Sequence, residues 1–157
     1  MSILPARPSC QLLAIAALSL VSLPVFAQGT GHDWQKTYSI GGSTSLTIET
    51  GDSSLDIQPC GDCKEIRVQV HSGRDLSEYR LVEHQEGDHV FFSFKEKPHI
   101  GMLNWRGQSG TKVTVETPAH LELAAKTSDG NLTARELTGN LQVQSGDGSV
   151  RDRKSVV

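Results

Sequence analysis

After its first 27 residues the chain has no long apolar run, no excess of basic charge and no helical periodicity. Without a long apolar run, this part of the chain has no segment suited to crossing a bilayer. The 15 Lys and Arg residues are interspersed with 18 Asp and Glu residues, which excludes the basic face that nucleic-acid phosphates require. Because apolar residues do not recur at helical spacing, the sequence predicts one turn of helix at most, at Asp75–Tyr79.

Several catalytic and metal-binding motifs are also missing. The chain has no Gly-x-Ser-x-Gly elbow, which excludes that class of serine hydrolase. It lacks the dense Gly-Gly-x-Gly-x-Asp repeat of calcium ladders. The histidines do not follow the Cys60–Cys63 pair at the spacing of a zinc finger, and His84 and His89, which flank a Gly-Asp turn, are the best-placed pair. The sequence therefore predicts no cofactor, no metal site and no catalytic residues.

The first 27 residues have the pattern of an export signal. An apolar run extends from Leu12 to Val25, and Val25-Phe26-Ala27 offers the small residues at which a signal peptidase cuts. An uncleaved anchor is the alternative, but the run is short for a membrane-spanning helix. Cys10 precedes the run, whereas a lipid-attachment cysteine would follow it. We therefore predict a signal peptide at 1–27 and one domain at 28–157, exported to the periplasm or outer surface of a bacterial cell.

Apolar and polar residues alternate through most of the remaining sequence. A period of two places the apolar residues on one face of a strand and the polar residues on the other. Gly-Asp and Asp-Gly pairs separate the segments and suit tight turns. The sequence thus predicts an all-β domain with one wet face per strand. The expected inward residues include Leu46, Ile48, Leu55, Ile57, Ile66, Val68, Val70, Val90, Phe92, Phe94, Val113, Val115, Leu123, Ala125, Leu141 and Val143.

One phrase, an alternating strand followed by an Asp turn and a second strand, occurs three times. Its turns contain Asp52, Asp129-Gly130 and Asp147-Gly148, and the last two aspartates are 18 residues apart. Leu123, Leu132, Leu141 and Val150 recur every nine residues, as expected of stacked half-coils that share a core. We predict a repeat-built, solenoid-like coiled β-sheet with a hairpin insertion from about Ser72 to Gly110. An antiparallel β-sandwich is the alternative.

These phrases have the form Leu-x-Val-x-Ser/Thr-x-Asp-Gly-x-Val and follow an export signal and the segment Val113-Thr-Val-Glu-Thr-Pro-Ala. In this they resemble the bacterial putative adhesin domain, a family of β-strand repeats of unknown function, from Trp34 to Arg151. The resemblance implies an exported, solenoid-like module with a role in adhesion and no catalytic residues. The chain departs from the pattern at Ser53, which replaces a turn glycine, and after Val150, where alternation stops. We interpret it as a shortened member.

The sharpest local signal is Cys60-Gly-Asp-Cys63, between two expected strands. Two thiols this close in an exported protein are expected to form a disulfide that fixes a turn. Half of a metal site and a redox centre are the alternatives. Redox chemistry would need a helix N-terminus or a cation beside the first cysteine, and the surroundings here are strand and loop.

The repeated aspartates have two interpretations. Aspartate at a turn commonly bonds to its own backbone, and this structural role is the expected one for Asp52, Asp129 and Asp147. In a solenoid, however, Asp129 and Asp147 would lie one above the other at an edge. Such an arrangement would also suit ion binding, or a polysaccharide-cleaving site that uses carboxylates.

A long glycine-containing loop, Pro98–Gly110, joins two expected strands. Trp105 and Arg106 within it are residue types favoured at interaction hot spots, so we name them as the candidate contact residues. The alternative is that Trp105 caps the open end of the core.

Together these features predict a non-enzymatic, exported module for adhesion or cell-envelope scaffolding, whose partner is a component of the envelope or of an extracellular surface. A carbohydrate-binding or polysaccharide-cleaving domain is the alternative. The repeat is cut short near the C-terminus, where position 152, expected to face inward, is Asp152. We therefore predict self-association through the Leu141–Val150 edge.

Export with cleavage after Ala27 is the first testable prediction. The secreted product should begin at Gln28, because Val25-Phe26-Ala27 follows the apolar run. Intact mass spectrometry of the exported protein measures this directly. A product that retains residues 1–27 would contradict it.

Overall fold

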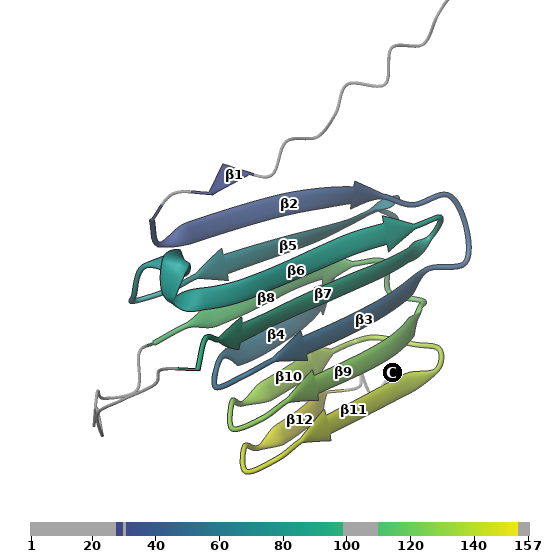
Figure 1. Cartoon of the computed structure of the whole chain (residues 1–157). Coiled ribbons are helices and arrows are strands. Elements are labelled where there is room, and N and C mark those ends of the chain that lie inside the picture. The colour runs from purple at the N-terminus through teal and green to yellow at the C-terminus, as the bar shows by residue number, and fades with distance from the viewer. Residues whose placement is uncertain (1–27, 30, 99–109, 154–157) are drawn as a thin grey trace, which may run out of the picture.

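The computed structural model describes residues 28–29, 31–98 and 110–153, which form two facing β-sheets (Figure 1). Within these residues no helix is long and apolar enough to span a membrane. The elements, in chain order, are β1 (Gln28–Gly29), β2 (Asp33–Ser39), β3 (Ser45–Thr50), β4 (Ser54–Pro59), β5 (Glu65–His71), the 3-10 turn η1 (Leu76–Glu78), β6 (Tyr79–Glu86), β7 (His89–Glu96), β8 (Lys112–Thr117), β9 (Glu122–Thr127), β10 (Leu132–Arg135), β11 (Leu141–Ser145) and β12 (Val150–Arg153).

Both sheets are mixed and open. Sheet A has the order β1-β2-β5-β8-β4-β10-β12, and sheet B has the order β11-β9-β3-β7-β6. The all-β prediction is confirmed. The two layers are sandwich-like, but many of their strand pairs are parallel rather than antiparallel. The solenoid-like coil stays a prediction.

The three repeated phrases pair with one another in register. Each contributes one strand to sheet B and the next strand to sheet A, as β3–β4, β9–β10 and β11–β12. In sheet B, Leu123 pairs with both Leu46 and Leu141. In sheet A, Leu132 likewise pairs with Leu55 and Val150. Equivalent positions of the phrase therefore stack directly, and a slip of one residue would turn every apolar side chain outward.

The segment predicted as an insertion contains the expected hairpin, since β6 and β7 pair antiparallel from Tyr79↔Glu96 to Glu86↔His89. The segment also joins the stacked strands, because its strand β7 pairs parallel with β3. β8, which follows the segment, pairs parallel with β4. Antiparallel strands β5 and β2 then extend sheet A beyond β8. The short 3-10 turn η1 lies within the segment expected to hold one helical turn.

A continuous apolar core fills the space between the sheets. Strands β3 and β8 bury every second residue, as the alternating sequence predicts. Leu46, Ile57 and Phe92 are each 0% exposed, and Tyr79 stacks on Phe94 at a ring-centroid distance of 4.6 Å. The ring of Trp34 on β2 lies tilted against the ring of Phe92, with the ring centroids 5.4 Å apart. The antiparallel extension of sheet A therefore also covers the core.

The turns that link the two sheets lie on one another at one side of the molecule (Figure 1). We call residues 51–53, 128–130 and 146–148 the turn stack. Ser128 N donates to Thr50 O at 3.2 Å, and Asp147 N donates to Ser128 O at 3.0 Å, so hydrogen bonds connect the turns as well as the strands. The hydroxyl of Thr127 donates to Gly51 O at 2.9 Å. Ser145 Oγ likewise donates to Gly130 O at 3.4 Å, so the hydroxyl residue before the second and third turns bonds to the turn of the preceding copy.

Glycine recurs in the turn stack because the backbones approach too closely for a side chain. A Cβ atom on Gly130 would overlap the carbonyl oxygen of Ser53, and one on Gly148 would overlap the carbonyl oxygen of Gly130. Ser53 occupies the equivalent position at the head of the stack. The strands next to β3 and β4 on this side are β7 and β8, and the segment that joins them is longer than the repeated turns. Ser53 therefore does not stack on a short turn of the same kind. The departure from the glycine pattern thus has a structural reason.

Replacing Gly130 with Ala should destabilise the fold by about 2–3 kcal/mol, because the new methyl group overlaps backbone that is hydrogen-bonded on both sides. Thermal or urea unfolding would measure the loss. Gly110→Ala is the matched control, since a Cβ there meets no atom of the described residues within 4 Å. Equal stability of the two variants would contradict the close stacking of the turns.

Candidate functional site

The turn stack opens onto a polar cavity of about 490 Å³. Asp52, Asp129 and Asp147 line it together with Asn131, Thr111 and Ser149. Asn131 Oδ1 accepts bonds from Ser149 N at 3.3 Å and Ser149 Oγ at 2.9 Å, which ties the second turn to the third. The aspartates of all three repeated turns therefore line one cavity.

Carboxylates in this cavity influence one another. Desolvation raises the pKa of Asp52 above its ordinary value of 3.8, the negative charges of Asp129 and Glu96 raise it further, and Arg74 partly opposes them. A hydrogen bond between the Asp52 and Asp129 side chains also favours the protonated form. The raised pKa favours the protonated carboxyl of Asp52, which can then donate a hydrogen bond to the Asp129 side chain.

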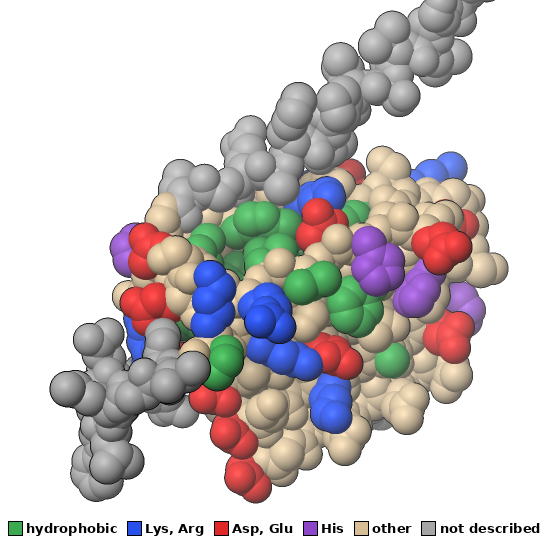
Figure 2. All heavy atoms as spheres, viewed as in Figure 1, with side chains coloured by type: hydrophobic (Ala, Val, Ile, Leu, Met, Phe, Trp, Pro, Cys, Tyr) green, Lys and Arg blue, Asp and Glu red, His purple; other side chains and the backbone are tan. Residues whose placement is uncertain are grey.

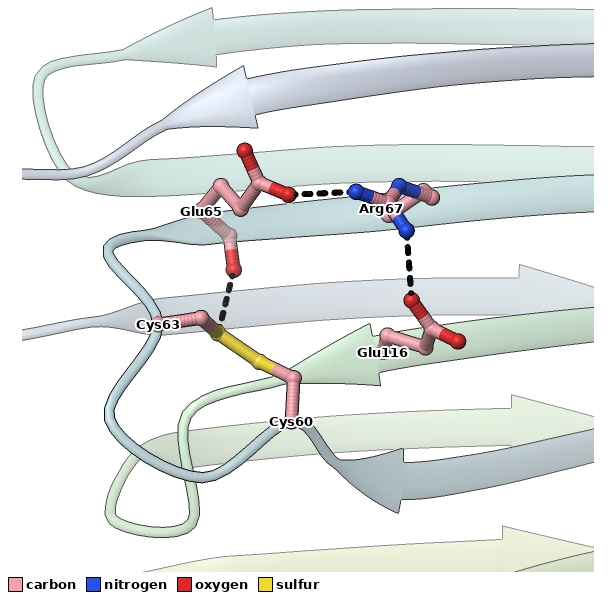
Figure 3. Close-up of a disulfide and its surroundings, with 5 residues drawn as sticks. All are labelled: Cys60, Cys63, Glu65, Arg67 and Glu116. Carbon is pink, nitrogen blue, oxygen red and sulfur yellow. Dashed lines mark hydrogen bonds and ion pairs between the residues drawn. A yellow bond between two sulfur atoms is a disulfide. The ribbon is translucent and has the colours of Figure 1, made fainter.

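The two cysteines form the predicted disulfide (Figure 3). Cys60 and Cys63 are bonded, with their Cα atoms 5.8 Å apart, and they close the turn between β4 and β5. Beyond this turn the Arg67 guanidinium forms salt bridges with two carboxylates. Its Nη2 lies 2.6 Å from Glu65 Oε1, and its Nη1 lies 3.0 Å from Glu116 Oε2. Because both sulfurs are in the disulfide, neither offers the thiolate that metal binding or redox attack needs.

The remaining predicted site residues are not brought together. Trp105 and Arg106 lie outside the described residues. His84 and His89 do not face each other, since His84 pairs with Phe91 and His89 with Glu86. In the parts of the chain that the structure describes, no three His, Cys, Asp or Glu side chains gather as a metal-ligand set.

Sequence reasoning missed an aromatic patch on the outer face of sheet B, which we define as Val82, His84, Phe91, His89 and Thr47. The His84 ring stacks on the Phe91 ring at a centroid distance of 4.9 Å, and Val82 is 44% exposed. The His89 Nε2 and Thr47 Oγ1 atoms lie 3.1 Å apart. Figure 2 shows hydrophobic side chains beside histidines on this face. The patch offers apolar rings bordered by hydrogen-bonding groups.

A signal for this patch was present in the sequence. Strand β7 reads His-Val-Phe-Phe-Ser-Phe-Lys-Glu, where Val90, Phe92 and Phe94 satisfy the inward alternation and Phe91 breaks it. An aromatic residue at a water-facing strand position exposes apolar surface. Thr47 and His84 are the cross-strand neighbours of Phe91 on its two sides.

The carboxyl pair predicts a specific pH dependence. The unfolded chain releases the Asp52 proton near pH 3.8, whereas the folded chain holds it to a higher pH, so Asp52 makes folding less favourable as the pH rises through this window. We expect Asp52→Asn to raise the melting temperature at pH 7 by about 1–3 °C and to have little effect near pH 3. Calorimetry at both pH values, with Asp147→Asn as control, checks this. An equal gain at both pH values would contradict it.

No family model and no curated protein matches the sequence. Among solved structures, the fold is similar to that of a putative cell adhesion protein from Clostridium sporogenes, with 13% identity, a TM-score of 0.51, and 73% of this chain and 57% of that chain covered. A putative adhesin from Bacteroides fragilis is 14% identical, with a TM-score of 0.37 and coverage of 77% and 62%. A putative lipid binding protein from Parabacteroides distasonis is 14% identical, with a TM-score of 0.33 and coverage of 78% and 61%. The chain spans 57–62% of the length of these solved chains. The first similarity establishes a shared fold.

Proposed function

We propose that this chain is an exported, non-enzymatic β-repeat module that attaches to a component of the cell envelope or of an extracellular surface, in adhesion or in envelope scaffolding. The shared fold with the Clostridium sporogenes protein, whose name refers to cell adhesion, supports this by analogy. The Cys60–Cys63 disulfide supports export, because disulfides persist in oxidising compartments.

The stacked strand pairs act as a short coil of the solenoid type. Support comes from in-register parallel pairing in both sheets and from the hydrogen bonds between successive turns. The outer faces of such a coil are broad, and continuous ladders of hydrogen bonds between strands keep their backbone rigid. Side chains on these faces lose little freedom when a partner binds, since the strands beneath them are already fixed.

The aromatic patch is the observation that carries the proposal. Phe91 is half-buried at a position where the alternation calls for a polar residue, and His84 covers one side of it. Exposed aromatic residues rimmed by polar groups mark interaction surfaces on soluble proteins. Trp105 and Arg106 remain predicted contacts of the same module.

The turn cavity favours a second candidate function. Asp52, Asp129 and Asp147 line one polar cavity, where burial and the charge of Asp129 raise the pKa of Asp52, and glycan-cleaving enzymes hold one carboxyl group protonated. A carbohydrate-binding or polysaccharide-cleaving domain is therefore the alternative. Incubation with a panel of polysaccharides distinguishes the two, since cleavage abolished by Asp52→Asn would favour the enzyme.

The binding proposal is tested by removing the two rings of the patch. Phe91→Thr combined with His84→Thr keeps residues that favour strands and deletes the stacked surface. Binding to isolated envelope fractions and to a glycan array should weaken by about ten-fold or more, as for a hot-spot side chain.

Thr114→Ala on the outer face of sheet A is the matched control, because Thr114 faces away from the patch. Its binding should equal that of the unaltered chain. Binding that survives loss of both rings, with both variants folded, would locate the contact elsewhere.

A further inference from the structure

The two sheets end together at one side of the molecule. β11 is the edge of sheet B and β12 is the edge of sheet A among the described strands, and they lie next to each other (Figure 1). In the preceding strand pair, Leu123 is 1% exposed and Leu132 is 0% exposed. At the equivalent positions of the last pair, Leu141 is only half-buried and Val150 is 45% exposed. A further layer of strands would bury them.

The two edges of sheet B are protected to different degrees. β6 carries Arg80, Glu83 and Glu86 and is bridged to β2 by side chains: Lys36 Nζ meets Glu83 Oε1 at 2.6 Å, and Gln85 Nε2 donates to Ser39 O at 2.6 Å. β11, with the sequence Leu-Gln-Val-Gln-Ser, has no charge and no proline. Charge and proline are the usual means of protecting an edge strand from pairing. Among the described strands, β11 is therefore an edge without these protections.

The sequence of β11 is nearly symmetric about Val143, with a glutamine on each side. In an antiparallel pair, residues directly opposite each other lie on the same face of the sheet. Two copies centred on Val143 would therefore place Val143 against itself on the inner face. Gln142 would lie opposite Gln144 of the partner subunit on the outer face, where their amide groups can bond to each other. This self-complementarity favours a second copy of the chain as the occupant of the edge.

We propose that two copies of this chain dimerise through antiparallel pairing of β11 with β11, around a two-fold axis at Val143. The axis runs perpendicular to both sheets, so each sheet continues into the same sheet of the partner. The contact is isologous and closes after two copies. It brings Leu141, Val143 and Val150 of each copy under the cover of the other. The proposal is independent of the function assigned to the aromatic patch.

The same axis brings β12 of one copy beside β12 of the other, and Arg151 on this strand is exposed. Like charges across the axis oppose association when they are not screened. Dimerisation should therefore strengthen as salt rises from about 10 mM to about 150 mM. A parallel, head-to-tail continuation of the coil would need a matching open edge at the opposite end of sheet B, and there β6 is bridged by β2.

A charge exchange at the two glutamines tests the pairing in its proposed register. Gln142 and Gln144 are both exposed, so substituting them should leave the fold intact. Gln142→Lys with Gln144→Lys sets like charges opposite each other twice and should weaken dimerisation several-fold. Gln142→Lys with Gln144→Glu sets opposite charges at the same places and should restore it. Sedimentation velocity over a wide concentration range measures both variants, and thermal melts check that they fold.

Cross-linking gives a second readout. Antiparallel partners have Cα atoms about 4.5–5.5 Å apart, within the range of a disulfide, so Val143→Cys should oxidise to a covalent dimer. Val82→Cys, on an exposed apolar residue outside the proposed contact, is the control and should link more slowly. Three results would overturn the proposal: a strict monomer at all concentrations and salt levels, equal linking of the two cysteine variants, or oligomers that keep growing beyond two copies.

Discussion

Contact between successive turn backbones is the constraint on which the rest of this fold depends. The carbonyl oxygen of Ser53 occupies the space of a Cβ on Gly130, and the carbonyl oxygen of Gly130 occupies that of a Cβ on Gly148. A residue with a side chain would push the turns apart and break the bonds between them. Because the turns fix the register of the strands on both sides, they also decide which residues face inward. Formation of the apolar core therefore depends on Gly130 and Gly148, which allow the turns to stack, as well as on the apolar residues themselves.

The same stacking concentrates negative charge. Register places Asp52, Asp129 and Asp147 at equivalent points of adjacent turns around one cavity, and burial together with the negative charge of Asp129 raises the pKa of Asp52. A repeat cannot vary its turn position freely once the register is set, since each copy aligns with the next. Aspartate suits a tight turn in each copy taken alone. Repulsion between the carboxylates appears only when the copies are assembled. Protonation of Asp52 reduces this repulsion.

Local periodicity predicted the strands because one face of each is buried. Leu46, Val90 and Val113 lie in the core as their alternation indicated, and the β6–β7 hairpin follows from its Gly87-Asp88 turn. Val150 was expected to face the core by the nine-residue spacing, yet it is 45% exposed, because spacing along the chain does not reveal whether a further layer covers the last pair. The positions of β2 and β5 beside β8 depend on contacts between distant segments. Phe91 was missed because its inward neighbours already satisfied the pattern.

The two ends of sheet B show how edge protection and repetition conflict. At β6 the chain has left the repeat, so its residues are free to carry charge, and Glu83 accepts bonds from both Lys36 and Tyr38 of β2. β11 still belongs to the repeat, and a repeat strand must be able to pair on both sides. The neutral alternation that allows β9 to pair with β3 and β11 at once is the same property that leaves β11 open. An edge made from a repeat therefore needs either a cap of different composition or a second molecule to cover it.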